Sequence, residues 1–360
     1  MNEMSRQATQ RKTIRDLVVK HPLLIFLLLA FTISWVGVAL SDWIDLGLAN
    51  GFGVIGSISP ALAALVVSAC RNPGSSGLEA RKRWRLFGIL VVLALAIMAC
   101  RRLWVTPEWL VIADTRYATV PYPNVWAVVI DLLAAGLVAL ILSGVLSSKE
   151  GVHGLLDSLD LRKRPVRWYW WFIAMGIYPL VNILGNAVSA LMGQPVQIAV
   201  STPFLPGLAV DLFLTFCYFM IGGGGLEEVG WRGFVLPYLQ KGDRPLRATI
   251  ILAIFWALWH LPFLWFGGLQ GSVVNVVLGL GSFFLVGIIP YALLFTAVFN
   301  RTGGSLPIAI VLHTSINVTS TLFQPATAAT NILWLVFSAV LLIWMWRAPQ
   351  TFAYRNSTKY

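Results

Sequence analysis

The sequence is poor in charged residues, and acids are the scarcest of them. Only 11% of the 360 residues are charged, with 15 Asp and Glu against 26 Lys and Arg, whereas 58% are hydrophobic. Soluble domains carry about a quarter of charged residues, so this composition excludes an ordinary soluble domain and indicates a chain that folds in lipid. The few ionisable groups at membrane depth are therefore informative, because burying each one is costly.

Cysteine and familiar metal motifs are also scarce. Cys70, Cys100 and Cys217 fall in or at the ends of apolar segments, and no CxxC pair is present. This excludes a disulfide framework and a thiolate metal site. No HExxH sequence occurs either, so any zinc site would differ from that of the zincins.

What the chain has in abundance is long apolar windows. A helix needs about 20 apolar residues to cross the hydrocarbon, and roughly ten windows of that kind are present. We therefore predict an all-α fold, a polytopic transmembrane helix bundle of about 8–10 spans in a lipid bilayer, the cell membrane if the source is bacterial. The windows run approximately 23–41, 52–70, 86–103, 126–147, 169–191, 207–226, 248–266, 274–299, 305–322 and 331–346.

Basic residues indicate how these spans are oriented. Lys and Arg gather before the first span and then in alternate loops, which places both termini in the cytoplasm. Arg101, Arg102 and Arg116 break this rule, since they fall in the long loop assigned to the outside. The net charge of +11 is dispersed over these loops instead of forming one face, so we expect anionic lipid and no nucleic acid as its partner.

The chain reads as one membrane domain in four parts, with no soluble module. Residues 1–22 form a basic cytoplasmic N-terminus without a cleavable signal pattern. Residues 23–204 carry the N-terminal spans and, near 147–168, a cytoplasmic amphipathic segment that predicts an interfacial helix. Residues 205–325 form the membrane core in which the motifs described below lie, and 326–360 hold the last span and the cytoplasmic tail.

Two adjacent acids follow a glycine run at 222–225. On a helix Glu228 and Arg232 share a face and can pair, whereas Glu227 points about 100° away. This geometry makes Glu228 structural and leaves Glu227 free to act as a general base. The four glycines permit a break in the helix, and a charge cluster that merely ends a span is the alternative.

Two histidines lie in later apolar spans. His260 follows the aromatic and apolar residues 256–259. Pro262 favours a kink in this helix, because it leaves the Leu258 carbonyl without its helical partner. His313 and Asn317 share one helix face. Counting from the polar turn between Gln240 and Arg247 places Glu227 and His260 at one depth. Each histidine alone would suit helix packing; together with Glu227 they suggest a site.

Peptide hydrolysis needs an activated water and donors for the oxyanion. In a metal-free scheme Glu227 and His260 activate the water, while His313 and Asn317 stabilise the oxyanion. In a metal scheme Glu227, His260 and His313 bind zinc with water in the open position. The spacing leaves both schemes open.

The motifs resemble those of a known family. Glu227 to Gly233, Trp256 to His260 and His313 to Asn317 are similar to the EExxxR, FxxxH and HxxxN motifs of the CAAX protease and bacteriocin-processing family, also called the abortive-infection family. The resemblance covers about residues 205–325 and is close to the type II CAAX prenyl endopeptidases. It departs at Trp256, which stands where the family has Phe and would narrow substrate access.

The resemblance implies an intramembrane endopeptidase, with Glu227 as general base, Glu228 and Arg232 supporting it, and His260, His313 and Asn317 completing the site. Its substrate would be a membrane-associated protein or peptide, either of CAAX type or resembling a bacteriocin or leader peptide. Two other classes stay open. A transporter would use Asp131 and Asp211 as an ion site, and a non-catalytic immunity or scaffold protein would need none of these residues.

Overall fold

The computed structural model describes residues 15–43, 55–74, 81–104, 125–195, 205–242, 244–266, 272–323 and 327–354. Arg116 lies outside these ranges, as do the basic residues before position 15 and after position 354 that contribute to the predicted orientation. The predicted outer loop between the third and fourth spans also lies almost wholly outside them.

The described residues are helical and contain no strand, which confirms the all-α prediction. Apolar runs form helices in lipid because only a helix satisfies every backbone group within its own segment. The helices are α2 (Pro22–Trp43), α4 (Ser57–Arg71), α5 (Arg81–Trp104), α7 (Val125–Ser143), η3 (Val145–Ser148), α8 (Glu150–Leu156), η4 (Asp157–Leu159), α9 (Trp168–Leu191), α10 (Leu205–Gly222), α11 (Gly224–Gly230), η5 (Trp231–Val235), α12 (Leu236–Leu239), α13 (Pro245–Trp259), α14 (Leu261–Phe266), α15 (Val273–Ser282), η6 (Phe283–Ile288), α16 (Ile289–Arg301), α17 (Leu306–Leu322), α18 (Ala328–Arg347) and η7 (Pro349–Phe352).

The apolar helices coincide with the predicted windows. Within the described residues, six helical runs are long and apolar enough to span a membrane, and four shorter apolar helices accompany them. The longest run, Gly207–Leu239, joins α10, α11, η5 and α12. The chain is therefore an integral multi-pass membrane protein.

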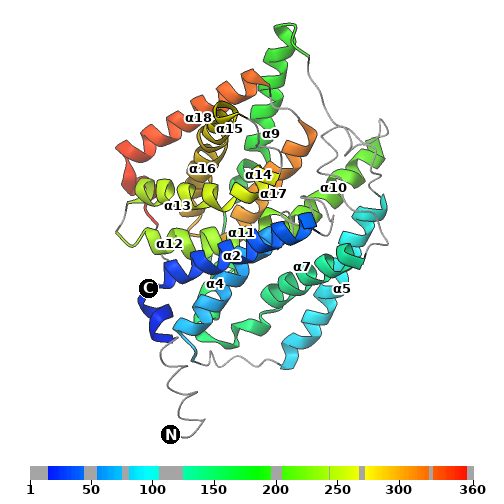
Figure 1. Cartoon of the computed structure of the whole chain (residues 1–360), viewed down its shortest axis with the longest axis vertical. Coiled ribbons are helices and arrows are strands. Elements are labelled where there is room, and N and C mark those ends of the chain that lie inside the picture. The colour runs from blue at the N-terminus through cyan, green and yellow to red at the C-terminus, as the bar shows by residue number, and fades with distance from the viewer. Residues whose placement is uncertain are drawn as a thin grey trace, which may run out of the picture.

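The bundle has two flanks with α11 between them. Figure 1 shows α5 and α7 side by side on one flank, and α13, α16 and α18 on the other. The short helix α11 contacts α4, α10 and α17. A segment this short is held by its neighbours, since seven residues are too few for a stable helix alone.

Close backbone contact fixes the position of α11. A Cβ added at Gly230 would lie 2.5 Å from the Pro60 Cβ, so only glycine permits this approach of α11 to α4. Immediately after it, the fully buried Trp231 packs edge-on against Phe26 and Trp259, with ring centroids 5.5 and 5.9 Å away. These contacts place the two acids of α11 in the centre of the bundle.

The structure corrects the assignment of Arg101 and Arg102 to an outer loop. Both lie in the last turn of α5 and are buried. Arg102 donates from Nε and Nη2 to the two carboxylate oxygens of Asp131 on α7, each at 2.8 Å, and Arg101 lies 4.3 Å above the Tyr218 ring of α10. The sequence prediction was wrong because hydropathy alone placed these cations at a membrane boundary, whereas a paired cation can be buried.

The predicted interfacial helix at 147–168 is also different in the structure. Only Glu150–Leu156 forms an α-helix, α8, and the η4 turn follows it. Leu155 and Leu156 are buried in the main core instead of facing lipid, while Leu161 is exposed. Leucines spaced along a helix look the same in sequence whether they face lipid or protein, so the prediction could not choose between them.

Candidate active site

The glycine run breaks the helix that carries the two acids, as predicted. α10 ends at Gly222, Gly223 has an extended backbone, and α11 begins at Gly224. A Cβ at Gly224 would overlap the imidazole ring of His313. The break and the missing side chain therefore let α17 bring His313 against the start of α11.

Glu228 is the centre of a buried polar cluster. Its Oε1 accepts a hydrogen bond from Arg232 Nη1 at 2.9 Å and another from His313 Nδ1 at 2.6 Å. Glu228 and Arg232 are fully buried, and His313 is 6% exposed. The predicted pair one helical turn apart is confirmed, and His313 joins it from α17. An ionised carboxylate only accepts, so His313 Nδ1 carries a hydrogen.

Glu227 faces a different neighbour, as its position on the helix requires. Its Oε2 accepts a hydrogen bond from the indole Nε1 of Trp256 on α13 at 3.2 Å. The Glu227 residue is 6% exposed. The two acids are thus divided: Glu228 is held by a cation and an imidazole, and Glu227 by one indole N–H.

His260 lies at a break between two helices, where Pro262 was expected to produce a kink. α13 ends at Trp259, and α14 begins at Leu261. His260 Nδ1 is 2.7 Å from the backbone oxygen of Trp256. A carbonyl only accepts, so Nδ1 carries the hydrogen, and in the neutral ring Nε2 keeps its lone pair.

Aromatic rings join these polar groups. The Arg232 guanidinium lies 4.4 Å above the Trp256 ring and 3.9 Å above the Phe295 ring of α16. Trp256 also meets His260 and His313 edge-on, with centroids 5.6 and 5.8 Å apart. Trp256 therefore contacts Glu227, Arg232 and both histidines. Sequence reasoning gave it a steric role only and missed Phe295, for which an apolar helix offers no signal.

Asn317 is the predicted site residue that the structure does not join to the others. It lies one turn beyond His313 on α17 and is half-buried. No hydrogen bond links it to the acids or to His313 in the described structure. Its catalytic role stays a prediction.

The same residues were considered as zinc ligands. Among the described residues, no three His, Cys, Asp or Glu side chains form a group that could hold a metal ion. His260 turns Nδ1 to a backbone oxygen, and His313 turns Nδ1 to Glu228. These bonds leave the Nε2 atom of each ring for a metal, but as placed the three side chains do not form one ligand group. Zinc binding by Glu227, His260 and His313 stays a prediction.

Comparison with known proteins finds a family model that matches the part of the chain carrying these residues. Residues 209–319 match the model of a family described as type II CAAX prenyl endopeptidase Rce1-like. This segment of the chain is therefore similar to that family, and we refer to it as the Rce1-like segment. It runs from α10 into α17 and contains all six predicted site residues, Glu227, Glu228, Arg232, His260, His313 and Asn317.

One relative extends the likeness beyond the Rce1-like segment. The CAAX prenyl protease 2 of Methanococcus maripaludis is 28% identical over 174 residues, which are 46% of this chain and 64% of that protein. The chain thus spans slightly less than two thirds of that relative's length. The activity printed in the relative's name is therefore a hypothesis for this chain.

Proposed function

We propose that this protein is an intramembrane endopeptidase that hydrolyses peptide bonds of membrane-associated proteins or peptides. The observation that carries the proposal is the unequal treatment of two adjacent buried acids. Glu228 is bound to Arg232 and His313, whereas Glu227 receives one indole hydrogen bond. A carboxylate with spare acceptor capacity beside two imidazoles suits a general base.

In the proposed reaction one water molecule bridges Glu227 and the Nε2 atom of His260. Glu227 takes one of its protons, and the water oxygen attacks the scissile carbonyl carbon, whose C–O π electrons move to the oxygen. His313, protonated at both ring nitrogens, donates from Nε2 to this oxyanion, and Asn317 donates from its amide. Glu227 then gives its proton to the amide nitrogen, the C–N bond breaks, and a carboxylic acid and an amine leave.

The partners of these groups support their roles. The Glu228 carboxylate accepts a hydrogen bond from His313 Nδ1 at 2.6 Å and so fixes the orientation of the imidazole ring. The backbone oxygen of Trp256 fixes the His260 tautomer that leaves Nε2 as an acceptor. The Trp256 indole fixes the Glu227 side chain, a role that the Phe of the family motif could not perform.

The transporter alternative loses support from the same structure. Its ion site would use Asp131 and Asp211 with the glycine-broken helix, and Asp131 is bound through both oxygens to Arg102. A buried bidentate pair stabilises the contact of α5 with α7 and does not offer an open site for a transported ion.

Cleavage assays test the proposal. Purified protein is incubated with membrane-anchored peptides that carry or lack a prenylated CAAX end, and with leader-type peptides. Glu227→Gln is compared with Glu150→Gln, which makes the same change at an exposed acid on α8. We expect cleavage by the wild type and by Glu150→Gln and none by Glu227→Gln. A Glu227→Gln protein that cuts like the wild type would refute the mechanism.

The same assays distinguish the remaining alternatives. If a chelator removes activity and zinc restores it, the metal scheme replaces the metal-free one. The prenylated and unprenylated peptides have the same sequence, so their cleavage rates show whether the lipid is recognised. We expect a membrane-anchored peptide to be cut whether or not it carries the prenyl group.

A further inference from the structure

A basic pocket lies apart from the candidate active site, at one end of the bundle. It has a volume of about 690 Å³ and lies where α9 begins, where α16 ends, and beside the segment that follows α18. None of the six predicted site residues lines it. Its position at the ends of membrane helices places it at the boundary between lipid and water, on the face predicted to be cytoplasmic.

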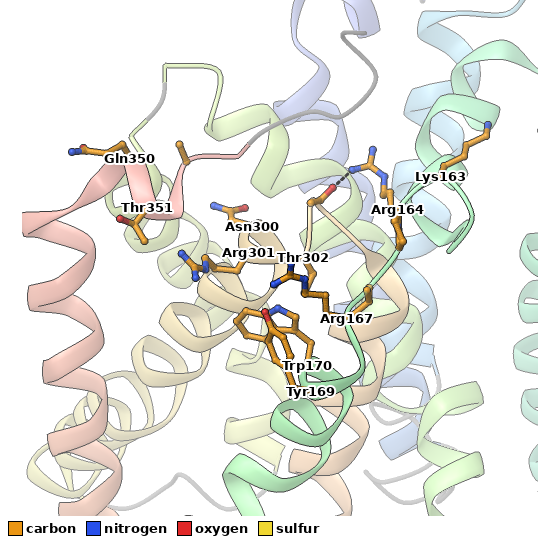
Figure 2. Close-up of a pocket in the computed structure, with 14 residues that line it drawn as sticks. Lys163, Arg164, Arg167, Tyr169, Trp170, Asn300, Arg301, Thr302, Gln350 and Thr351 are labelled. Atoms are coloured by element: carbon orange, nitrogen blue, oxygen red, sulfur yellow. Dashed lines mark hydrogen bonds between the residues drawn. The ribbon is translucent and has the colours of Figure 1, made fainter.

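The charge of the pocket has one sign. Its lining includes Lys163, Arg164, Arg167 and Arg301 and contains no Asp or Glu. Figure 2 shows Arg167 reaching over the pocket toward the end of α16, whereas Lys163 points away. Lys163 already pairs with Asp157 at 2.8 Å, so it contributes less to the pocket than the others.

Arg164 is built into the wall of the pocket. It is 7% exposed, and its Nη1 donates to the backbone oxygen of Gly303 in the turn between α16 and α17, as the dashed line in Figure 2 shows. Gly303 has a φ of 67°, a left-handed conformation that suits glycine. Arg164 thus fixes this turn, while Arg167 and Arg301 are exposed and remain for a ligand.

The surroundings of the pocket favour a lipid over a soluble anion. Tyr169 and Trp170 line it, and such rings gather at the headgroup level of membranes. From there α9 continues as a spanning helix, with Phe172 and Met175 exposed at 71% and 52%. A headgroup in the pocket would therefore have an apolar helix surface beside it for its acyl chains.

We propose that this pocket binds the phosphate headgroup of an anionic phospholipid. The recognising chemistry is a phosphate oxyanion held by Arg167 and Arg301, since guanidinium groups match phosphate geometry in bidentate contacts. Basic pockets between membrane helices bind anionic headgroups in this way. The inference is independent of the proposed proteolysis, and binding can be measured without any substrate.

Native mass spectrometry of delipidated protein tests the proposal. The protein is titrated with phosphatidylglycerol and, separately, with phosphatidylcholine. The variant Arg167→Gln/Arg301→Gln is compared with Arg244→Gln/Arg247→Gln, which removes the same charge from exposed residues on the same predicted face but outside the pocket. We expect the wild type and the control to retain phosphatidylglycerol over phosphatidylcholine, and the pocket variant to bind it about tenfold to thirtyfold more weakly.

Two results would overturn the assignment. In the first, the pocket variant and the control lose the same amount of phosphatidylglycerol binding, which would make the effect one of overall charge. In the second, glycerol phosphate without acyl chains binds as tightly as the lipid, which would assign the pocket to a soluble phosphate. Unchanged melting temperatures of both variants establish that weaker binding does not come from misfolding.

Discussion

Within the described residues an arginine is buried against a carboxylate both at a flank of the bundle and in its centre, and the surroundings of the two pairs differ. At the flank, Arg102 and Asp131 satisfy each other through two hydrogen bonds of 2.8 Å. In the centre, the Glu228–Arg232 pair has one bond of 2.9 Å. Glu228 Oε2 and Arg232 Nε and Nη2 have no hydrogen-bond partner in the described structure.

The difference separates a structural pair from a cluster suited to chemistry. A closed bidentate pair holds its two charged groups against each other and fixes two helices. The central cluster adds a second acid, Glu227, and two imidazoles, and it leaves acceptor and donor capacity for other groups. We infer that the flanking pair acts in folding and the central cluster in proteolysis, and each prediction below tests that division.

The largest effect is expected at Glu228, which is both part of a buried ion pair and part of the central cluster. Glu228→Gln leaves Arg232 as a buried cation without its counter-ion, and it weakens the bond to His313. We expect a loss of about 3–5 kcal/mol in the free energy of unfolding, together with at least a hundredfold loss of cleavage. Thermal unfolding in detergent and peptide cleavage measure the two. Loss of stability with full activity would remove Glu228 from the site.

Asp131→Asn tests the other side of the comparison. It leaves Arg102 buried without its counter-ion, so a similar loss of about 3–5 kcal/mol is expected. Cleavage per folded molecule should stay within about threefold of the wild type, because α5 and α7 lie outside the cluster. The double variant Arg102→Met/Asp131→Leu should recover much of the stability. A hundredfold loss of cleavage in the folded fraction would show that the flanking pair belongs to the site.

Gly224→Ala probes the close approach of His313 to α11. The added methyl group overlaps the imidazole, so His313 must move, and misplaced catalytic groups lose about a hundredfold in rate. Gly176→Ala is the control, since a Cβ there meets no atom within 4 Å. The ratio of the two cleavage rates measures the effect. Equal rates would mean that His313 tolerates displacement.

The smallest effect is expected for Trp256→Phe, which restores the aromatic residue of the family motif. It removes the hydrogen bond to Glu227 and keeps most of the ring contacts. The loss of one hydrogen bond from a neutral donor to a carboxylate predicts about a tenfold lower kcat with little change in KM. Trp84→Phe, at an exposed position on α5, is the control. An unchanged kcat would assign Trp256 to packing alone.

Local spacing predicted part of the central cluster, and long-range pairing escaped it. Glu228 and Arg232 are one turn apart, so helix geometry alone gave their contact. The common depth of Glu227 and His260 followed from counting residues to a shared turn, and the bond of Trp256 to both agrees with it. That His313 would bind Glu228 could not be predicted, because 85 residues separate them.

The flanking pair shows why the rest of the fold was harder. Arg102 and Asp131 lie 29 residues apart on different helices, a separation that the spacing along one helix does not connect. From the sequence we therefore assigned Arg102 to a loop and considered Asp131 as a ligand of a transported ion. Burial of charge in lipid depends on the partner across the helix interface, which spacing along one helix does not contain.

The division between the two clusters is tested most directly by measuring cleavage and thermal stability together for Glu227→Gln and Asp131→Asn. The account predicts opposite results: Glu227→Gln keeps the melting temperature and loses cleavage, whereas Asp131→Asn lowers the melting temperature and keeps cleavage per folded molecule. Undiminished cleavage by Glu227→Gln, under conditions in which the wild type cuts the same peptide, would contradict the account.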